Sequence, residues 1–282
     1  MNEREREEEV ERILVALDAS SHSHSALQAA AELAARLHAE LQALFIEDVN
    51  VWRLGALPFA QEVGIFSARC RQLEPGELTR QLEAQVRRMR RRFRRSTEWI
   101  GVECTFRRTR GRVVPQILEA ASEADMVILG KGAWATFETG HLGPAVRAVL
   151  TEIPIPTMVL QAGAQLELPV LAIYDGSQAA HRALSRAATL ARRDNHRLMV
   201  LILGNEEEPA GRLQARAETW LEGRGLDVRY QILTEASASR LATLVARQGY
   251  GTVVLPRESS VIKDEAVLDF LDETEVPVLL VR

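Results

Sequence analysis

A polar segment with the pattern Asp-x-Ser follows an apolar run at two places in the chain. Asp18, Ala19 and Ser20 follow the run at 13–17, and the same pattern recurs at 175–177. A carboxylate at such a position can accept a hydrogen bond from a ligand amine or hydroxyl. It can equally cap the next helix, because Asp and Ser side chains accept from the free N–H groups of a first helical turn. Both roles stay open on these residues alone.

A glycine-rich segment follows another apolar run near residue 130. Gly130, Gly132 and Ala133 come first, and nine residues further on Gly143 and Pro144 open a predicted helix. Glycines at a strand end let backbone amides approach a phosphate, and a helix N-terminus favours the anion. The simpler alternative is a surface loop that needs glycine only to turn.

The two Asp-x-Ser segments correspond to each other because the chain repeats itself. Residues 12–46 align without a gap with 169–203, which places Asp18 on Asp175 and His24 on His181. The two repeats also end alike, in IPIPTMVLQ and EVPVLLVR. We therefore expect two homologous domains, 1–161 (half one) and 162–282 (half two).

Each half alternates short apolar runs with amphipathic stretches, the pattern of a parallel α/β sheet. The predicted fold is α/β, with two tandem doubly wound, Rossmann-like domains, each a five-stranded parallel sheet with helices on both faces. Ligands of such sheets bind outside the carboxyl ends of the strands, where the strand order reverses. We expect strands at 13–17, 41–46, 102–108, 125–130, 157–161, 170–174, 198–203, 227–233, 251–256 and 276–281, and in half one helices at 25–37, 77–98, 112–123 and 144–151.

Three further segments receive interpretations that involve no catalytic chemistry. His22 and His24 lie before the predicted helix, and we expect solvent-facing loop residues rather than a metal site. The arginines at 87–95 alternate with apolar residues at helical spacing, which favours a solvated helix face over a patch for nucleic acid or a partner. The insertion 47–76 of half one either covers the sheet of its own half or lines a groove toward half two. Packing is the default interpretation, and the alternative is a cavity for a small apolar ligand.

Composition bounds the class of protein. Of 282 residues, 46% are hydrophobic and 26% charged, which is typical of a globular chain with a core. A formal charge of −4 provides no basic field for nucleic acid or an anionic membrane. The two cysteines lack metal-site spacing, and no apolar run approaches the roughly 18 residues of a membrane span. The Glu- and Arg-rich start is unlike a signal peptide. We expect a cytoplasmic protein without nucleic-acid or membrane partners.

The sequence resembles the universal stress protein family in tandem form. The resemblance rests on VALDAS and IYDGS, on GRVVPQILEAASEADMVILG at 111–130, and on the closing IPIPTMVLQ. Nucleotide-binding members carry G-x-x-G, nine residues, then G followed by Ser or Thr. Gly130 and Gly143 match the first and last of these glycines, and Asp18 matches the Asp that contacts the nucleoside end. The resemblance implies ATP as the ligand of half one, in a degenerate loop at 130–144.

Two residues of half one depart from the family pattern. Ala133 stands where the second glycine belongs, and Pro144 replaces Ser or Thr, which removes a hydroxyl and an N–H from the anion site. Gly132 could relieve the first defect by shifting the turn. In half two the matching stretch VLPRESSVIKDEAVLDF has no glycine, and Asp264 and Glu265 lie where an anion would bind. We expect no ATP in half two.

The resemblance also implies a pseudo-dimer within the chain, joined through the last strands 157–160 and 278–281, with the outer surface free for a homodimer. The predicted function is a stress-adaptation binding or sensor protein, without catalytic residues, that binds adenine nucleotide weakly in half one. Two alternatives stay open. One is a scaffold that binds a protein partner or a small apolar ligand without nucleotide. The other is a slow ATPase, for which the sequence supplies no identifiable Mg²⁺ ligand or positioned water.

Overall fold

The structure is a computed structural model of the 282-residue chain. It describes residues 10–57, 61–63, 70–72, 75–135, 141–167, 169–192, 196–204, 209–233, 237–259 and 261–282.

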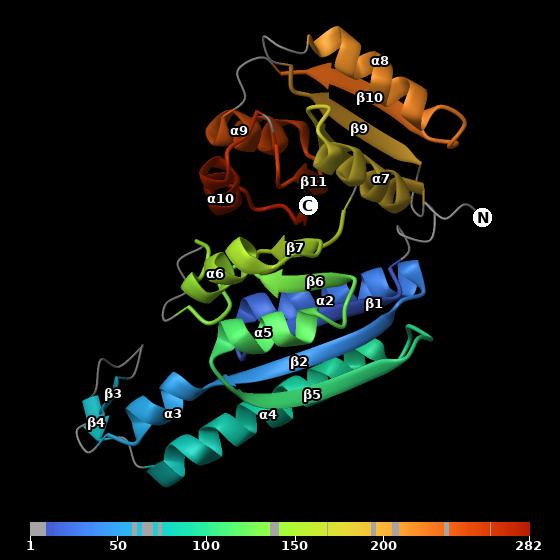
Figure 1. Ribbon diagram of the computed structural model, residues 1–282. Helices are drawn as coiled ribbons and strands as arrows, with labels where there is room; N and C mark the ends of the chain where they lie inside the picture. The colour runs from blue at the N-terminus through green and yellow to red at the C-terminus, as the bar shows by residue number, and fades with distance from the viewer. Residues whose placement is uncertain are drawn as a thin grey trace.

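Half one contains a five-stranded parallel sheet in which helices connect the strands (Figure 1). Along the sheet its strands follow the order β5-β2-β1-β6-β7, so the order reverses between β1 and β6. Its elements are β1 (Arg12–Leu17), α2 (Ser21–Leu37), β2 (Glu40–Asp48), α3 (Val49–Gly55), β3 (Gln61–Val63), β4 (Cys70–Gln72), α4 (Pro75–Thr97), β5 (Cys104–Gly111), α5 (Val113–Ala121), β6 (Met126–Gly130), α6 (Pro144–Glu152) and β7 (Thr157–Leu160).

Half two repeats this arrangement with the strand order β10-β9-β8-β11-β12. The reversal here lies between β8 and β11, the counterparts of β1 and β6. Its elements are β8 (Val170–Tyr174), α7 (Gln178–Arg192), β9 (Arg197–Ile202), α8 (Ala210–Leu221), β10 (Asp227–Ile232), α9 (Ala238–Gln248), β11 (Thr252–Pro256), α10 (Asp264–Glu273) and β12 (Val278–Val281).

The last strands of the two halves join both sheets into one sheet of ten strands. β12 pairs with β7 antiparallel, with Leu279 opposite Met158, whereas the other neighbouring strands of this ten-stranded sheet pair parallel. The expected pairing of the last strands is confirmed. The arrangement leaves β5 and β10 as the two edges of the sheet.

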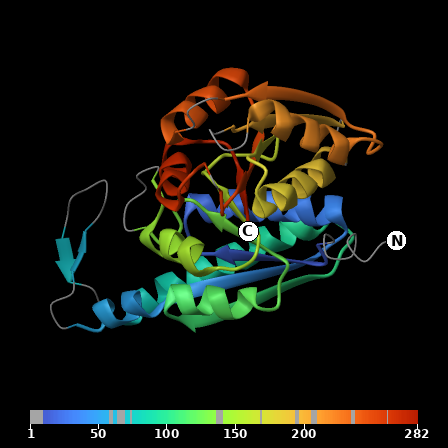
Figure 2. The same cartoon turned by 45° about the horizontal axis from the view of Figure 1, so that its top comes forward.

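Helices cover both faces of this sheet, as expected (Figures 1 and 2). One core combines the sheet with α2, α4, α7 and α8, and it includes Leu27, Met89 and Leu184. The other core combines the opposite face with α5, α6, α9 and α10, and it includes Ile117, Val149 and Phe270. Both cores run through both halves, so the halves share their interior. None of the described helices has the length and apolar character that crossing a membrane requires.

Helix α2 begins earlier than the apolar pattern predicts. The pattern starts at residue 25, whereas the helix starts at Ser21, because the side chain of Ser20 accepts a hydrogen bond from the N–H of Ser23 and caps the first turn. His22 and His24 therefore lie on the helix and not in a loop. The expectation that both face solvent is wrong for His22, which is only 4% exposed.

The described elements of the insertion in half one extend away from the sheet (Figure 1). α3 continues from the carboxyl end of β2, and β3 and β4 form a small separate hairpin beyond it (Figures 1 and 2). Val51 and Leu54 of α3 are exposed, at 43% and 62%. Trp52 stacks against Arg110 of the edge strand β5, with the guanidinium carbon 3.7 Å from the ring centroid. Phe59, Ile65 and Phe66 lie outside the residues that the structure describes.

Candidate functional site

The carboxylate of Asp18 lies at the predicted position, where the strand order reverses at the end of β1. Its Oδ1 accepts hydrogen bonds from the backbone N–H and hydroxyl of Ser20, at 2.9 and 2.5 Å, and from the hydroxyl of Ser23, at 2.6 Å. Its Oδ2 accepts a 2.6 Å bond from the backbone N–H of Trp134. Asp18 thus joins the start of α2 to the loop after β6, and both of its oxygens have partners within the protein.

The loop after β6 is folded tightly onto Asp18. Trp134 adopts a left-handed backbone conformation with φ of 55°, which is uncommon for a residue other than glycine, Asn or Asp. This turn directs its N–H toward the carboxylate. Ala133, one position before it, is fully buried, and its N–H donates to the carbonyl of Gly130.

Two of the predicted phosphate-loop glycines make room for His22 of α2. A Cβ atom at Gly130 would lie 2.6 Å from the carbonyl carbon of His22, and one at Gly132 would lie 2.5 Å from its Nε2. The Nδ1 atom of the same ring accepts a bond from the N–H of Ala162, at 3.2 Å. Here the glycines permit close packing of α2 against the loop. Their predicted role toward a phosphate stays a prediction.

Gly143 and Pro144 pack against the same loop. The N–H of Gly143 donates 2.8 Å to the carbonyl of Lys131, and a Cβ atom at Gly143 would lie 2.6 Å from the carbonyl oxygen of Ala133. Pro144 occupies the first position of α6, where its fixed φ is favourable and its missing N–H would have no helical partner. The described parts of the loop on either side, 131–135 and 141–143, therefore pack against each other, and the N–H of Gly143 is satisfied internally.

The corresponding residues of half two form a similar arrangement. Asp175 is 3% exposed, and its Oδ1 accepts a 3.0 Å bond from the N–H of Ser177, as Asp18 does from Ser20. Its Oδ2 accepts a 2.6 Å bond from the hydroxyl of Ser259 in the loop after β11. Ser259 in turn accepts from the N–H groups of Val261 and Ile262. In each half the aspartate after the first strand holds the loop after the fourth strand.

Lys131 lies in the glycine-rich segment but points toward half two. It is 3% exposed, and its Nζ donates to the carbonyl oxygens of Asp272 and Thr274, at 2.9 and 3.0 Å, and to Oε1 of Gln161, at 3.3 Å. Asp272 lies in the last turn of α10 and Thr274 directly follows that helix, where carbonyl groups lack helical partners and a cation is favourable. Burial lowers the pKa of Lys131, while Asp272 and Glu275 oppose that shift.

The side chain of Asp272 completes this contact between the halves. Its Oδ1 accepts a 2.6 Å bond from the N–H of Leu142, and its Oδ2 pairs with Arg147 of α6 at 2.5 Å. Both ends of the loop at 130–144 are thereby fixed to α10. A ligand that needed this loop to move would also disturb the junction of the two halves.

The arrangement gathers a carboxylate, hydroxyl groups and backbone N–H groups at the carboxyl ends of β1 and β6. In the part of the chain that the structure describes, no three His, Cys, Asp or Glu side chains gather as metal ligands would. The loop lies at the carboxyl ends of the strands, where the strand order reverses and ligands of doubly wound sheets bind.

The family model described as "Universal stress protein family" matches residues 9–161. The chain belongs to this family. The universal stress protein Slr1230 of Synechocystis is 25% identical over 230 residues, which are 78% of this chain and 80% of that protein. This curated relative extends the likeness into half two.

Solved structures of similar proteins show the same tandem fold. A universal stress protein from Archaeoglobus fulgidus matches with a TM-score of 0.73 at 16% identity, over 95% of each chain. A protein of unknown function from Pseudomonas aeruginosa matches with a TM-score of 0.59 at 14% identity, over 98% of this chain and 93% of that one. The tandem universal-stress fold therefore covers both halves.

The residues that the sequence singles out lie at the carboxyl ends of β1 and β6, and Ala19 is exposed at the turn after β1. These residues are Asp18, Ser20, Gly130, Gly132, Ala133, Gly143 and Pro144. Their role in binding a nucleotide stays a prediction. Sequence reasoning missed three residues that close or anchor the loop, namely His22, Trp134 and Lys131. One signal was present for Lys131, because it is one of only two lysines in an arginine-rich chain.

Proposed function

We propose that this universal stress protein acts in stress adaptation as a binding module rather than an enzyme, and that adenine nucleotide binds weakly in half one and not in half two. The observation that carries the proposal is the hydrogen bond from the N–H of Trp134 to Asp18. It joins the group expected to hold the nucleoside to the loop expected to hold the phosphates.

The energy of this hydrogen bond determines by how much the affinity for ATP is lowered. A hydrogen bond to a charged group contributes about 1.5–3 kcal/mol. A ligand that binds only after the bond has broken loses that energy, and about 1.4 kcal/mol corresponds to a factor of ten in affinity. ATP would therefore bind about 10- to 100-fold more weakly than it would to an open loop. The buried methyl of Ala133 and the missing N–H of Pro144 act in the same direction.

Half two lacks the groups that would favour an anion. Asp175 is bound to Ser259, and Asp264 and Glu265 occupy the first turn of α10, the counterpart of α6. Carboxylates at a helix N-terminus compensate the dipole that would otherwise attract a phosphate. ATP accordingly has no favourable site there.

The test is calorimetric titration of ATP–Mg²⁺ into the wild-type protein and into matched Asp18→Asn and Asp175→Asn variants. We expect the wild type to bind ATP–Mg²⁺ with a dissociation constant in the millimolar range. The Asp18→Asn substitution should change this dissociation constant, whereas the Asp175→Asn substitution should leave it unchanged. Micromolar binding by the wild type, or binding that depends on Asp175, would refute the proposal. ATP hydrolysis by the wild type that disappears in the Asp18→Asn variant would favour the slow ATPase instead.

A further inference from the structure

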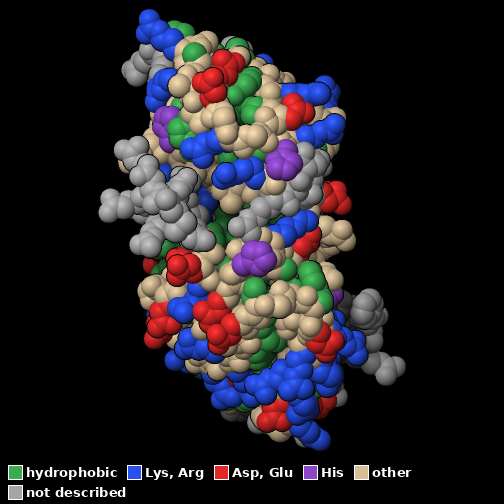
Figure 3. All heavy atoms as spheres, turned by 90° about the vertical axis from the view of Figure 1, so that its right-hand side faces the viewer, with side chains coloured by type: hydrophobic (Ala, Val, Ile, Leu, Met, Phe, Trp, Pro, Cys, Tyr) green, Lys and Arg blue, Asp and Glu red, His purple; other side chains and the backbone are tan. Residues whose placement is uncertain are grey.

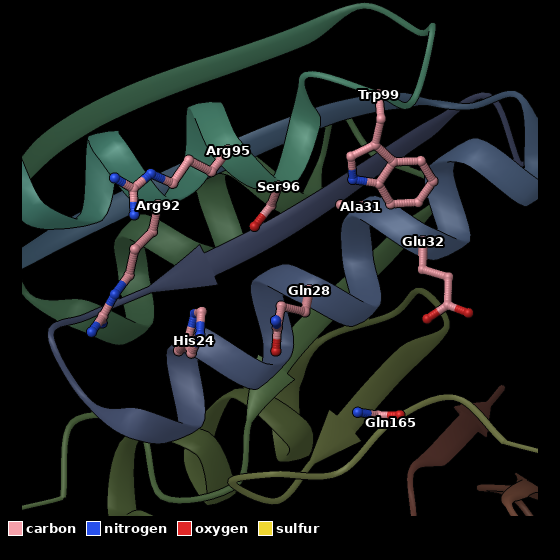
Figure 4. Close-up of a pocket in the computed structure, with 9 residues that line it drawn as sticks. All are labelled: His24, Gln28, Ala31, Glu32, Arg92, Arg95, Ser96, Trp99 and Gln165. Carbon is pink, nitrogen blue, oxygen red and sulfur yellow. The ribbon is translucent and has the colours of Figure 1, made fainter.

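A groove between α2 and α4 lies on the face of half one that these two helices cover, and none of the residues that line it belongs to the loop at 130–144 (Figure 4). Its volume is about 650 Å³, and its floor includes the buried Ala31. The linker between the halves contributes one residue to its border. The groove is lined by His24, Gln28, Ala31, Glu32, Arg92, Arg95, Ser96, Trp99 and Gln165.

The two ends of the groove differ in chemistry. Arg92 and Arg95 extend from α4 at one end, and the ring of Trp99 lies at the other (Figure 4). Neither arginine has an ion-pair partner among the described residues, and Glu32 is paired with Arg36 on its own helix. Trp99 is 63% exposed, which is unusual for so large an apolar side chain. The groove therefore offers two unpaired cations and an open aromatic face.

His24 leaves an unsatisfied polar atom beside the arginine end. Its Nδ1 is inaccessible to solvent and has no hydrogen-bond partner among the described residues. Burial lowers the pKa of His24, and the nearby charge of Arg92 lowers it further, so the ring is neutral near pH 7. A neutral ring adds no positive charge to that of the two arginines at this end of the groove.

In half two, the residue that corresponds to His24 has hydrogen-bond partners. The counterpart of His24 is His181, whose Nε2 lies 3.0 Å from the hydroxyl of Tyr174 and 3.1 Å from Nη2 of Arg216 on α8. Leu17 occupies the place of Tyr174 at the end of β1 and supplies no hydroxyl.

Trp99, which follows α4, and Trp220 of α8 also differ in whether a neighbouring side chain covers the ring. In half two, Arg224 covers Trp220, with its guanidinium carbon 3.5 Å from the ring centroid. Trp99 of half one has no such cover among the described residues. The histidine, arginine and tryptophan are thus satisfied within half two and left open in half one.

The surroundings of the groove favour an anion. Lys and Arg side chains gather at the end of the molecule that α4 and β5 form (Figure 3). Arg88, Arg91 and Arg94 of α4 are exposed near the groove, and a local excess of one charge raises the local concentration of the opposite ion.

We propose that this groove binds a small aromatic anion, an aromatic ring that carries a carboxylate or a phosphate monoester. Arg92 and Arg95 bind the anionic group, because guanidinium groups match the geometry of both anions. The ring of the ligand packs on Trp99. This site is separate from the nucleotide loop, so either proposal can fail without the other.

The test is NMR titration of the ¹⁵N-labelled full chain with phenyl phosphate and, in parallel, with benzoate. The chain has four tryptophans, and a Trp99→Phe variant assigns the indole N–H signal of Trp99. We expect saturable shifts of that signal, and the tighter of the two probes identifies the anionic group. Inorganic phosphate and phenol, which each lack one part, should bind at least about tenfold more weakly, since each loses one of the two interactions.

Matched variants locate the binding site. An Arg92→Gln/Arg95→Gln variant should weaken binding by about tenfold or more. An Arg88→Gln/Arg91→Gln variant removes the same charge from α4 outside the groove lining and should change it much less. Absence of binding by both probes at millimolar concentration overturns the proposal. Equal loss in the two arginine variants, or equal binding of inorganic phosphate and phenyl phosphate, overturns it as well.

Discussion

The Nζ atom of Lys131 lies 3.0 Å from the carbonyl oxygen of Thr274, so a residue of the glycine-rich segment in half one caps the last helix of half two. The same ammonium group also binds the carbonyl of Asp272, at 2.9 Å. Lys131 lies within the segment that matches the nucleotide motif, but its side chain joins the two halves. This junction, together with the bond from Trp134 to Asp18, explains why the loop is closed.

Replacing Lys131 should destabilise the whole chain. A Lys131→Met variant keeps much of the side-chain volume but leaves the carbonyls of Asp272 and Thr274 without their buried donor. Unsatisfied buried groups destabilise by about 1–3 kcal/mol. Urea denaturation measures this change. Lys263 is the matched control, because it is exposed and Lys263→Met should be nearly neutral. Equal effects of the two substitutions would show that the interdomain contact contributes nothing.

The lowered pKa of Lys131 predicts a pH dependence of stability. Its folded-state pKa lies below the usual 10.5, so between these two values the unfolded chain binds more protons than the folded chain. The free energy of unfolding contributed by this residue therefore rises with pH across that window. The difference in unfolding free energy between wild type and Lys131→Met should increase as the pH is raised toward 10.5. A difference that stays constant or decreases would contradict the assigned burial of the ammonium group.

The close contact of Gly132 with His22 makes a second structural prediction. In a Gly132→Ala variant the added methyl would lie 2.5 Å from Nε2 of His22, and overpacking of this kind destabilises by about 1–3 kcal/mol. The effect should shrink when His22 is already alanine, which a double-mutant cycle of thermal or urea unfolding measures. Gly76→Ala is the control, because a methyl there meets no atom within 4 Å. An undiminished effect in the His22→Ala background would mean that the two residues do not interact.

Much of the fold follows from local patterns in the sequence. Five-residue apolar runs such as 13–17 and 170–174 form buried strands, and the aligned repeats predict two similar halves. The start of α2 was harder to predict, because Ser20 caps a turn that contains no apolar periodicity. The positions of Asp18 and Gly130 at the carboxyl ends of β1 and β6 were also predictable, since each follows an apolar run that forms a strand.

The contacts that the site residues make within the protein could not be predicted from local patterns. Lys131 and its carbonyl acceptors are more than a hundred residues apart in the chain, and they meet because β7 and β12 join the two halves. Burial of His22 depends on the space beside Gly130 and Gly132, which is a property of packing. A polar or glycine-rich motif identifies the groups that are present, whereas the hydrogen-bond and packing partners of these groups depend on the tertiary structure.

The most direct test of the closed loop is the nucleotide content of the native, freshly purified protein, measured by denaturing it and separating the released small molecules. A closed loop predicts adenine nucleotide well below one per chain. It also predicts no rise in melting temperature until ATP–Mg²⁺ reaches millimolar concentration. Release of close to one adenine nucleotide per chain would contradict the account, because Asp18 and the loop would then have to be open in the functional protein.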